Sequence, residues 1–246
     1  TKGVRIITNT YRYAAGGGEL PDHNWDIVLD ASVGVYNDAG TTLATDGQTV
    51  QEWHDQSGNA NNGTQADFIR RPELDTSLYG GAGGVIFTSP PGTIENYLDL
   101  TSAITLPGNG YTAFFVCTRK STDGWSTALG GDPLVASYNI TNYQDDWYGT
   151  RTGGYFTVTG PQTGDMIMTV QNDSNTTYTF RHNGTDLGTP STGSATTSNA
   201  LRIGARGNTE NHEDAIAQIL HTADILTTGE MEEVESYLSD KWGIAI

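Results

Sequence analysis

Aromatic and polar residues gather between positions 138 and 155, in a mixture that could hold a sugar. Aromatic rings can pack on the C–H faces of a sugar, while carboxylates, amides and guanidinium groups bond its hydroxyls. The residues expected to form a carbohydrate-binding site are Trp125, Tyr143, Asp145, Asp146, Trp147, Tyr148 and Arg151. In the alternative interpretation the aromatic rings cover the core and the carboxylates are solvated. We expect the segment 138–155 to be a loop region.

Residue spacings typical of enzymes are missing from the sequence. The five histidines are scattered, without a His-Glu-x-x-His or a Gly-x-Ser-x-Gly element, and there is no zinc or phosphate-loop motif. A catalytic constellation assembled from distant loops is the only enzymatic alternative left open. We therefore predict a protein that is not an enzyme and needs no cofactor.

Calcium is the one ion for which the sequence offers ligands. Asp30, Asp145, Asp146 and Asp214 could supply oxygen atoms, although no twelve-residue EF-hand loop is present. Each of these carboxylates has an equally simple structural or solvated role. Calcium binding thus stays open and no metal site is predicted.

The charge balance narrows the classes of partner. Lys and Arg number 12 against 29 Asp and Glu, so the formal net charge is −17. Affinity for nucleic acid comes mainly from Lys and Arg displacing counterions, and anionic lipid surfaces attract cations in the same way. We expect no nucleic-acid partner and no membrane insertion.

Cysteine content and the first residues bear on location. Cys117 is the single cysteine, so no disulfide can form within the chain, and we expect a buried strand thiol. The segment that begins Thr1-Lys2-Gly3 lacks the hydrophobic stretch of a signal peptide. We expect an extracellular or virion-surface protein, whose leader was removed or which leaves the cell by assembly or lysis.

Short runs of alternating or continuous apolar residues between Gly, Asn and Asp clusters predict an all-β protein. The continuous apolar run Tyr111–Thr118 predicts a strand buried on both faces. Asn183-Gly184 after Thr176–His182 predicts a tight hairpin, with Leu187 on the return strand. The other expected strands are Trp25–Asp30, Thr49–His54, Gly84–Phe87, Leu134–Tyr138, Gly154–Thr159, Asp165–Gln171, Leu201–Gly204 and Asp214–Leu220.

One helix is expected near the end of the chain. Thr228 could cap it, and Gly243 could terminate it. Its apolar stripe would consist of Met231, Val234, Tyr237 and Leu238.

The first 24 residues differ from the remainder of the chain in composition and in hydrophobic pattern. One short β-like run, Val4 to Tyr13, is followed by a flexible Ala-Ala-Gly-Gly-Gly stretch. We predict an N-terminal arm or attachment segment at 1–24 and a single domain at 25–246.

Two ordered segments resemble a known family. The first runs through Val28-Leu29-Asp30-Ala31-Ser32, then Trp53-His54-Asp55-Gln56-Ser57-Gly58-Asn59, and then Arg71-Pro72. The second leads from Arg202-Ile203-Gly204 through the strand ending at Leu220 to Tyr237-Leu238-Ser239-Asp240-Lys241-Trp242-Gly243. Together they are similar to the opening and closing motifs of the concanavalin A-like lectin/glucanase domains, the laminin-G-like jelly rolls.

This resemblance implies a two-sheet antiparallel jelly-roll sandwich (concanavalin A-like) with one C-terminal helix. Trp53 would fill the core and Trp242 would pack the helix on a sheet, while Asp55, Ser57 and Asn59 would satisfy backbone donors in a turn. Related glucanases place their catalytic carboxylates as Glu-x-Asp-x-x-Glu on one strand. That run does not occur here.

Three functions follow in order of preference. The first is a non-catalytic, surface-displayed, lectin-like module, such as a phage decoration or fibre protein that binds glycans and contacts capsid or tail proteins through its arm. The second is a secreted bacterial carbohydrate-binding or adhesin domain. The third is a glycan-cleaving enzyme.

Overall fold

The computed structural model describes most of the predicted domain and little of the predicted arm. Its described residues are 18–88, 96–106, 110–119, 125–130, 140–143, 146–151, 154–159, 163–173, 177–188, 198–206, 210–211 and 215–246. The expected strand in the arm and the one at Leu134–Tyr138 lie outside them, and the division at residue 24 stays a prediction. In this part of the chain no helix has the length and apolar character needed to cross a membrane.

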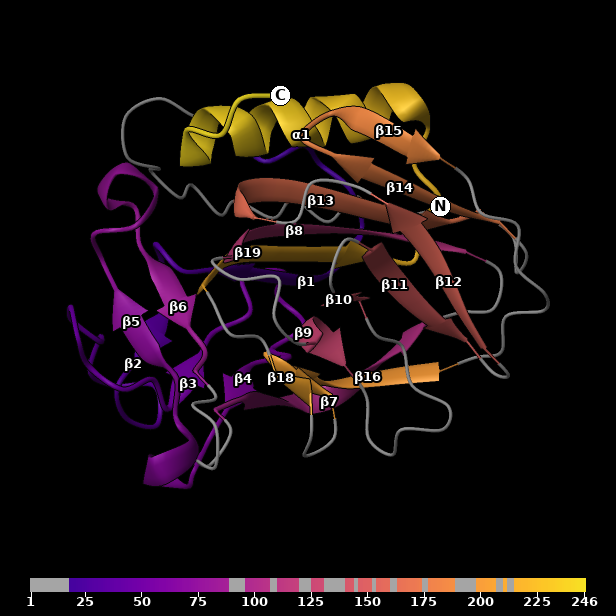
Figure 1. Ribbon diagram of the computed structural model, residues 1–246. Coiled ribbons are helices and arrows are strands. Elements are labelled where there is room, and N and C mark those ends of the chain that lie inside the picture. The colour runs from indigo at the N-terminus through magenta and orange to yellow at the C-terminus, as the bar shows by residue number, and fades with distance from the viewer. Residues whose placement is uncertain are drawn as a thin grey trace, which may run out of the picture.

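Two antiparallel sheets form the body of the protein (Figure 1). Sheet A has eight strands, and two of them, β8 and β13, are nine residues long. Its order is β15 (Thr185–Gly188), β14 (Tyr178–His182), β13 (Gly164–Asn172), β8 (Tyr111–Arg119), β19 (Ala215–Thr222), β6 (Gly84–Ile86) and β5 (Glu73–Asp75), with β1 (Trp25–Asp30) also paired to β19. Strands from both ends of the chain are therefore neighbours in this sheet.

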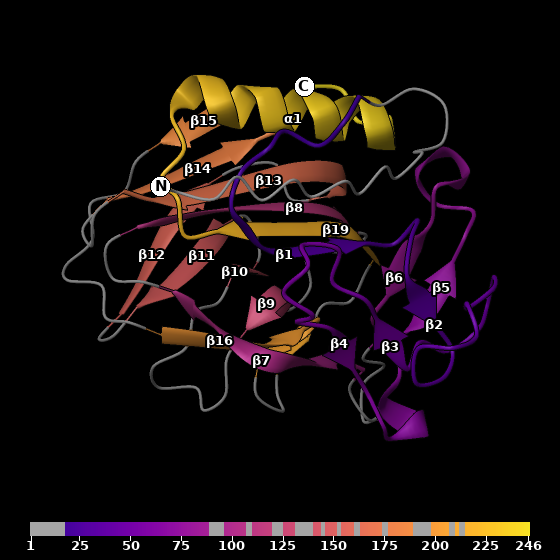
Figure 2. The ribbon, with the colours of Figure 1, turned by 180° about the vertical axis from the view of Figure 1, so that it is seen from behind.

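Sheet B has nine strands and faces sheet A across the core (Figure 2). Its order is β12 (Gly154–Thr159), β11 (Asp146–Arg151), β10 (Ile140–Tyr143), β9 (Trp125–Gly130), β16 (Ser198–Ile203), β7 (Leu98–Leu106), β4 (Gly63–Thr64), β3 (Glu52–Trp53) and β2 (Val35–Tyr36). The remaining short elements are β17 (Ala205–Arg206), β18 (Glu210–Asn211) and the 3-10 turns η1 (Phe68–Arg70) and η2 (Tyr79–Gly81). This arrangement confirms the predicted all-β jelly-roll sandwich.

The core lies between the sheets and confirms several predictions. Trp53 is fully buried, and all nine residues of β8 are buried, as its continuous apolar run predicts. Cys117 is buried on that strand and belongs to no disulfide, as expected. The strand expected at Thr49–His54 is reduced to β3 in sheet B, because Thr49 instead makes an isolated antiparallel bridge to Glu73 of β5 in sheet A, in which Val50 N–H donates to the Pro72 carbonyl.

A turn that follows β3 ties that strand to β1. Asp55 accepts hydrogen bonds from the backbone N–H groups of Val28 (2.9 Å), Ser57 (2.9 Å) and Asn61 (3.1 Å). The Asn59 amide donates to the Trp25 carbonyl at 3.0 Å. These residues of the resemblance motif thus have a structural role, as expected.

Helix α1 (Thr228–Trp242) lies across the outer face of sheet A, as Figures 1 and 2 both show. Its cap is Thr227 and not the predicted Thr228, because the Thr227 hydroxyl accepts from Glu230 N–H while Glu230 bonds back in a capping box. Gly243 ends the helix in the left-handed conformation, with φ 69°. The predicted stripe of Met231, Val234, Tyr237 and Leu238 is buried.

The hairpin between β14 and β15 turns at Asn183-Gly184, as predicted. The φ angles are 44° at Asn183 and 75° at Gly184, values that favour Asn and Gly. The Asn183 side chain also accepts from Ile167 N–H at 2.7 Å. The turn is therefore fastened to β13 as well as to its own strands.

A polar layer lies between α1 and sheet A, and the sequence did not predict it. The Arg181 guanidinium bonds both carboxylate oxygens of Glu235, with Nε at 3.0 and 3.2 Å and Nη2 at 3.0 Å. The Thr169 hydroxyl donates to the same carboxylate at 2.6 Å. Near the end of the helix the Trp242 indole donates to the Gln218 side chain at 2.7 Å. Buried Trp242 thus packs the helix on the sheet, as expected.

Candidate functional site

The predicted sugar-binding residues lie on three adjacent strands of sheet B. Trp125 begins β9, Tyr143 ends β10, and Asp146, Trp147, Tyr148 and Arg151 belong to β11. Asp145 lies outside the described residues. The expectation that 138–155 is a loop region is wrong, because β10 and β11 pair as a hairpin through this segment. Hydrogen-bonded strands therefore position the candidate site.

The register brings three of these positions into one row across the strands. Tyr143 pairs with Trp125 on β9 and with Asp146 on β11. Directly paired positions of an antiparallel sheet share a face and are close neighbours. The aromatic positions Trp125 and Tyr143 are thus paired across β9 and β10, and the carboxylate position Asp146 is paired with Tyr143 across β10 and β11.

Strand alternation divides the candidate residues between the two faces of the sheet. Successive residues of a strand face opposite sides, so Tyr148 shares the face of Asp146, whereas Trp147 and Arg151 belong to the other. Trp147 pairs with Asn142, and Arg151 pairs with Gly154 at the end of the hairpin between β11 and β12. The predicted residues therefore form two sets and not a single patch.

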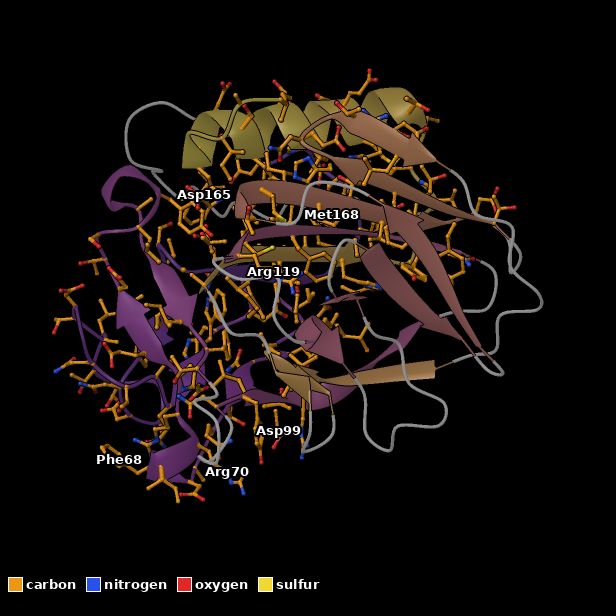
Figure 3. The ribbon with its side chains drawn as sticks, viewed as in Figure 1. Phe68, Arg70, Asp99, Arg119, Asp165 and Met168 are labelled. Atoms are coloured by element: carbon orange, nitrogen blue, oxygen red, sulfur yellow. The ribbon has the colours of Figure 1, made fainter. Side chains whose placement is uncertain are left out.

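A second aromatic and charged cluster lies further along sheet B, and sequence reasoning missed it. The Arg202 guanidinium lies 4.3 Å from the ring centre of Tyr97, and that of Arg70 lies 5.7 Å from it. Arg202 Nε also donates to Asp99 at 2.8 Å. Tyr97 is buried beneath these groups, and Arg70 and Asp99 extend from the same side of the molecule (Figure 3).

Phe68 is the most exposed of the large hydrophobic side chains recorded in the described residues, at 65%. It lies on η1, beside the exposed Ile69, and the Arg71 guanidinium is 5.6 Å from its ring centre. Arg71 itself is held by carbonyls, donating to Gln65 at 3.0 Å. The Arg71-Pro72 motif was the sequence signal nearest to this surface.

Titratable groups in the described part of the chain do not assemble into a metal centre. No group of three or more His, Cys, Asp or Glu side chains there is placed to hold an ion. Asp30 contacts Lys241 and Ser32, Asp214 and Asp145 lie outside the described residues, and Asp146 is described by its backbone position. The calcium option therefore stays a prediction for those positions alone.

Comparison with known proteins shows the fold and no family. No family model matches the sequence, and no curated protein matches it. The chain is similar to a botulinum neurotoxin type C structure concerned with interaction with two ganglioside molecules, at TM-score 0.59 and 10% identity over 87% of this chain and 51% of that one. It is also similar to the binding domain of Paraclostridial Mosquitocidal Protein 1, at TM-score 0.60 and 13% identity over 89% and 55%.

A third similar structure is the botulinum neurotoxin type G receptor-binding domain, with TM-score 0.58 and 12% identity over 88% of this chain and 52% of that one. The chain thus spans about half the length of each of these structures. At such low identities the likeness establishes the β-sandwich architecture. The concanavalin A-like assignment rests on the sequence motifs.

Proposed function

We propose that this protein is a non-catalytic glycan-binding module whose binding surface lies on β9, β10 and β11 of sheet B. The observation that carries the proposal is the row Trp125, Tyr143 and Asp146, set by the strand register. Tyr148 stands on the same face two residues along β11. Asp145, in the connection between β10 and β11, would extend the polar part of the surface.

The chemistry of this row suits a sugar. Neighbouring aromatic positions offer apolar faces for C–H groups, and a carboxylate accepts hydrogen bonds from hydroxyls. Two of the similar solved structures are described as receptor-binding or binding domains, and one concerns gangliosides, which are glycolipids. These likenesses support recognition over catalysis.

A glycan array followed by titration of the best ligand tests the proposal. Trp125→Ala and Tyr143→Ala should each weaken binding at least tenfold, or about 1.4 kcal/mol. Phe68→Ala is the matched control, because it removes an exposed aromatic ring from a different surface. Full retention of binding by both row variants, an equal loss in the control, or an array without any ligand would each refute the proposal.

Trp147→Ala and Arg151→Ala test the alternation argument separately. These two positions belong to the other face of β11, so sugar affinity should stay within about twofold of wild type if the variants are folded. A loss of sugar affinity confined to these two variants would show that the binding surface lies on the opposite face of the hairpin.

The setting that we propose is display on a particle or cell surface. A β-like run and a glycine-rich break precede the domain, as in an attachment arm, so capsid or tail proteins of a phage are the partners proposed for residues 1–24. A secreted bacterial adhesin would use the same sugar surface without that assembly. Deleting residues 1–18 should abolish assembly while the domain stays folded, and continued assembly of the truncated protein would refute the role of the arm.

A further inference from the structure

A buried lysine and a buried aspartate join the first strand of sheet A to the last helix. Asp30 is the last residue of β1, and Lys241 lies in the last turn of α1. Lys241 Nζ contacts Asp30 Oδ2, with side-chain exposures of 6% and 1%. The amine and the carboxyl carbon are thus held together in a site sheltered from water.

The second oxygen of this carboxylate is held in a different way. Asp30 Oδ1 accepts hydrogen bonds from the backbone N–H of Ser32 at 2.9 Å and from its hydroxyl at 2.6 Å. Two donors on one oxygen stabilise negative charge that develops there when a nucleophile adds to the carbonyl carbon. The oxygen next to the lysine therefore becomes the leaving group.

The surroundings also favour an uncharged amine. Burial lowers the pKa of Lys241, and the opposing attraction of Asp30 does not restore it. The Trp242 and Tyr237 rings, whose centres lie 4.8 and 5.8 Å from Nζ, form cation–π contacts that act against this shift. Burial nevertheless penalises the charged form of Lys241 and so promotes the neutral amine, which is the nucleophile.

We propose that Lys241 and Asp30 join in an intramolecular isopeptide bond. Nζ attacks Cγ of Asp30, the C–O bond to Oδ2 breaks, and the Nζ–Cγ amide bond forms. Of the three protons on the ammonium group, one stays on the amide nitrogen and two leave with Oδ2 as water. Oδ1 becomes the amide carbonyl oxygen, still bonded by Ser32, and no oxidant, reductant or other reactant is consumed.

The position of the bond gives it a physical consequence. It would close nearly the whole domain into one covalent loop, because the two residues are 211 positions apart. A cross-link over a long segment restricts the unfolded chain, and the helix could not detach from sheet A. This inference is independent of the sugar site and would hold for a domain with any function.

The mass of the intact, denatured chain tests the proposal directly. The wild-type protein should be lighter than its sequence by the mass of one water molecule. Trypsin should leave residues 13–70 joined to residues 207–246, since it cleaves after Arg12, Arg70 and Arg206 but not after a modified lysine. A chain without the bond would instead release residues 242–246 and show its full mass.

Lys241→Arg keeps the positive charge and cannot form the amide, so it should have its full calculated mass. Lys2→Arg is the matched control, because it removes a lysine outside the domain and should retain the loss of water. A full mass in freshly folded wild-type protein that persists after prolonged incubation would overturn the proposal, and the pair would then be an ion pair alone. Lys241→Arg should have its full mass whether or not it folds, so the mass of the wild-type protein decides the outcome.

Discussion

Replacing Glu235 by leucine should destabilise the protein strongly, although leucine is the better residue for an apolar helix stripe. The side chains of Arg181 and Glu235 are 7% and 1% exposed, so the variant leaves a guanidinium group buried without its carboxylate. Breaking a buried ion pair from one side costs about 3–5 kcal/mol, and Glu232, an exposed carboxylate 3.5 Å from Arg181 Nη2, offsets only part of that cost. The Thr169 hydroxyl loses its acceptor in the same variant.

The double variant Arg181→Met, Glu235→Leu should recover most of that loss. Replacing both charges by apolar groups of similar volume is often neutral or stabilising, because the desolvation penalty of the pair disappears with it. Adding Thr169→Val removes the remaining hydroxyl and should not lower stability further. Urea unfolding monitored by tryptophan fluorescence gives each free energy of unfolding, with an unchanged m-value showing that the same surface is exposed.

Two outcomes would refute this reasoning. A loss below about 1 kcal/mol in Glu235→Leu would mean that water reaches Arg181 and that the pair behaves as a surface salt bridge. A double variant no more stable than Glu235→Leu alone would show that the two side chains are not energetically coupled.

Two further predictions concern the turn after β3 and the start of α1. Asp55→Ala should lower the free energy of unfolding in urea by about 2–4 kcal/mol, because three backbone N–H groups lose their acceptor. The control Asp67→Ala removes a single exposed cap at η1 and should lower it by under about 1 kcal/mol. Equal losses in the two variants would contradict this prediction. Hydrogen bonds from Thr227 hold the pKa of Glu230 below its ordinary value, so its stabilising effect is complete above that ordinary value and is lost as the pH falls through the lowered one. Wild type should therefore lose stability relative to Glu230→Gln as the pH falls below the ordinary glutamate pKa of about 4.3, and a constant difference would contradict the capping-box contribution.

The features of the fold that the sequence predicts share local causes. A continuous apolar run predicts β8, and Asn183-Gly184 predicts the β14–β15 hairpin. An apolar stripe and a terminal glycine predict α1. Each depends on residues close together in the chain. The shortening of the strand at Thr49–His54 reflects the bridge of Thr49 to Glu73 in the other sheet, and no local pattern reveals that long-range pairing.

The polar layer under α1 has a signal in the sequence. Glu235 follows Met231 by four residues, so it belongs to the buried face that the stripe predicts. A carboxylate on such a face requires a partner, and Arg181 is a charged residue within a predicted strand, directly after Phe180. The pair was therefore foreseeable, whereas its geometry required the packing of helix on sheet.

For the candidate sugar site the sequence indicates the residue types but not their arrangement. Gly, Asn and Asp make the segment 138–155 resemble a loop, and the alternation of side chains between two faces holds only for a strand. Once β10 and β11 are known to pair, the same rule separates Trp147 from Tyr148 and aligns Tyr143 with Trp125. Composition thus identified the chemistry, and the register decides which residues can act together.

The position of α1 also bears on where a ligand can bind. Apolar contacts are non-directional, but the Arg181–Glu235, Gln218–Trp242 and Asp30–Lys241 contacts are directional and fix how the helix lies on sheet A. The outer face of sheet A is thereby occupied along the helix. In the described part of the chain α1 is the single α-helix, so no α-helix covers sheet B, the sheet to which the Trp125–Tyr143–Asp146 row and Arg202 belong. Sheet B therefore has no helix that would compete with a ligand for its surface, which agrees with the binding surface proposed from the strand register.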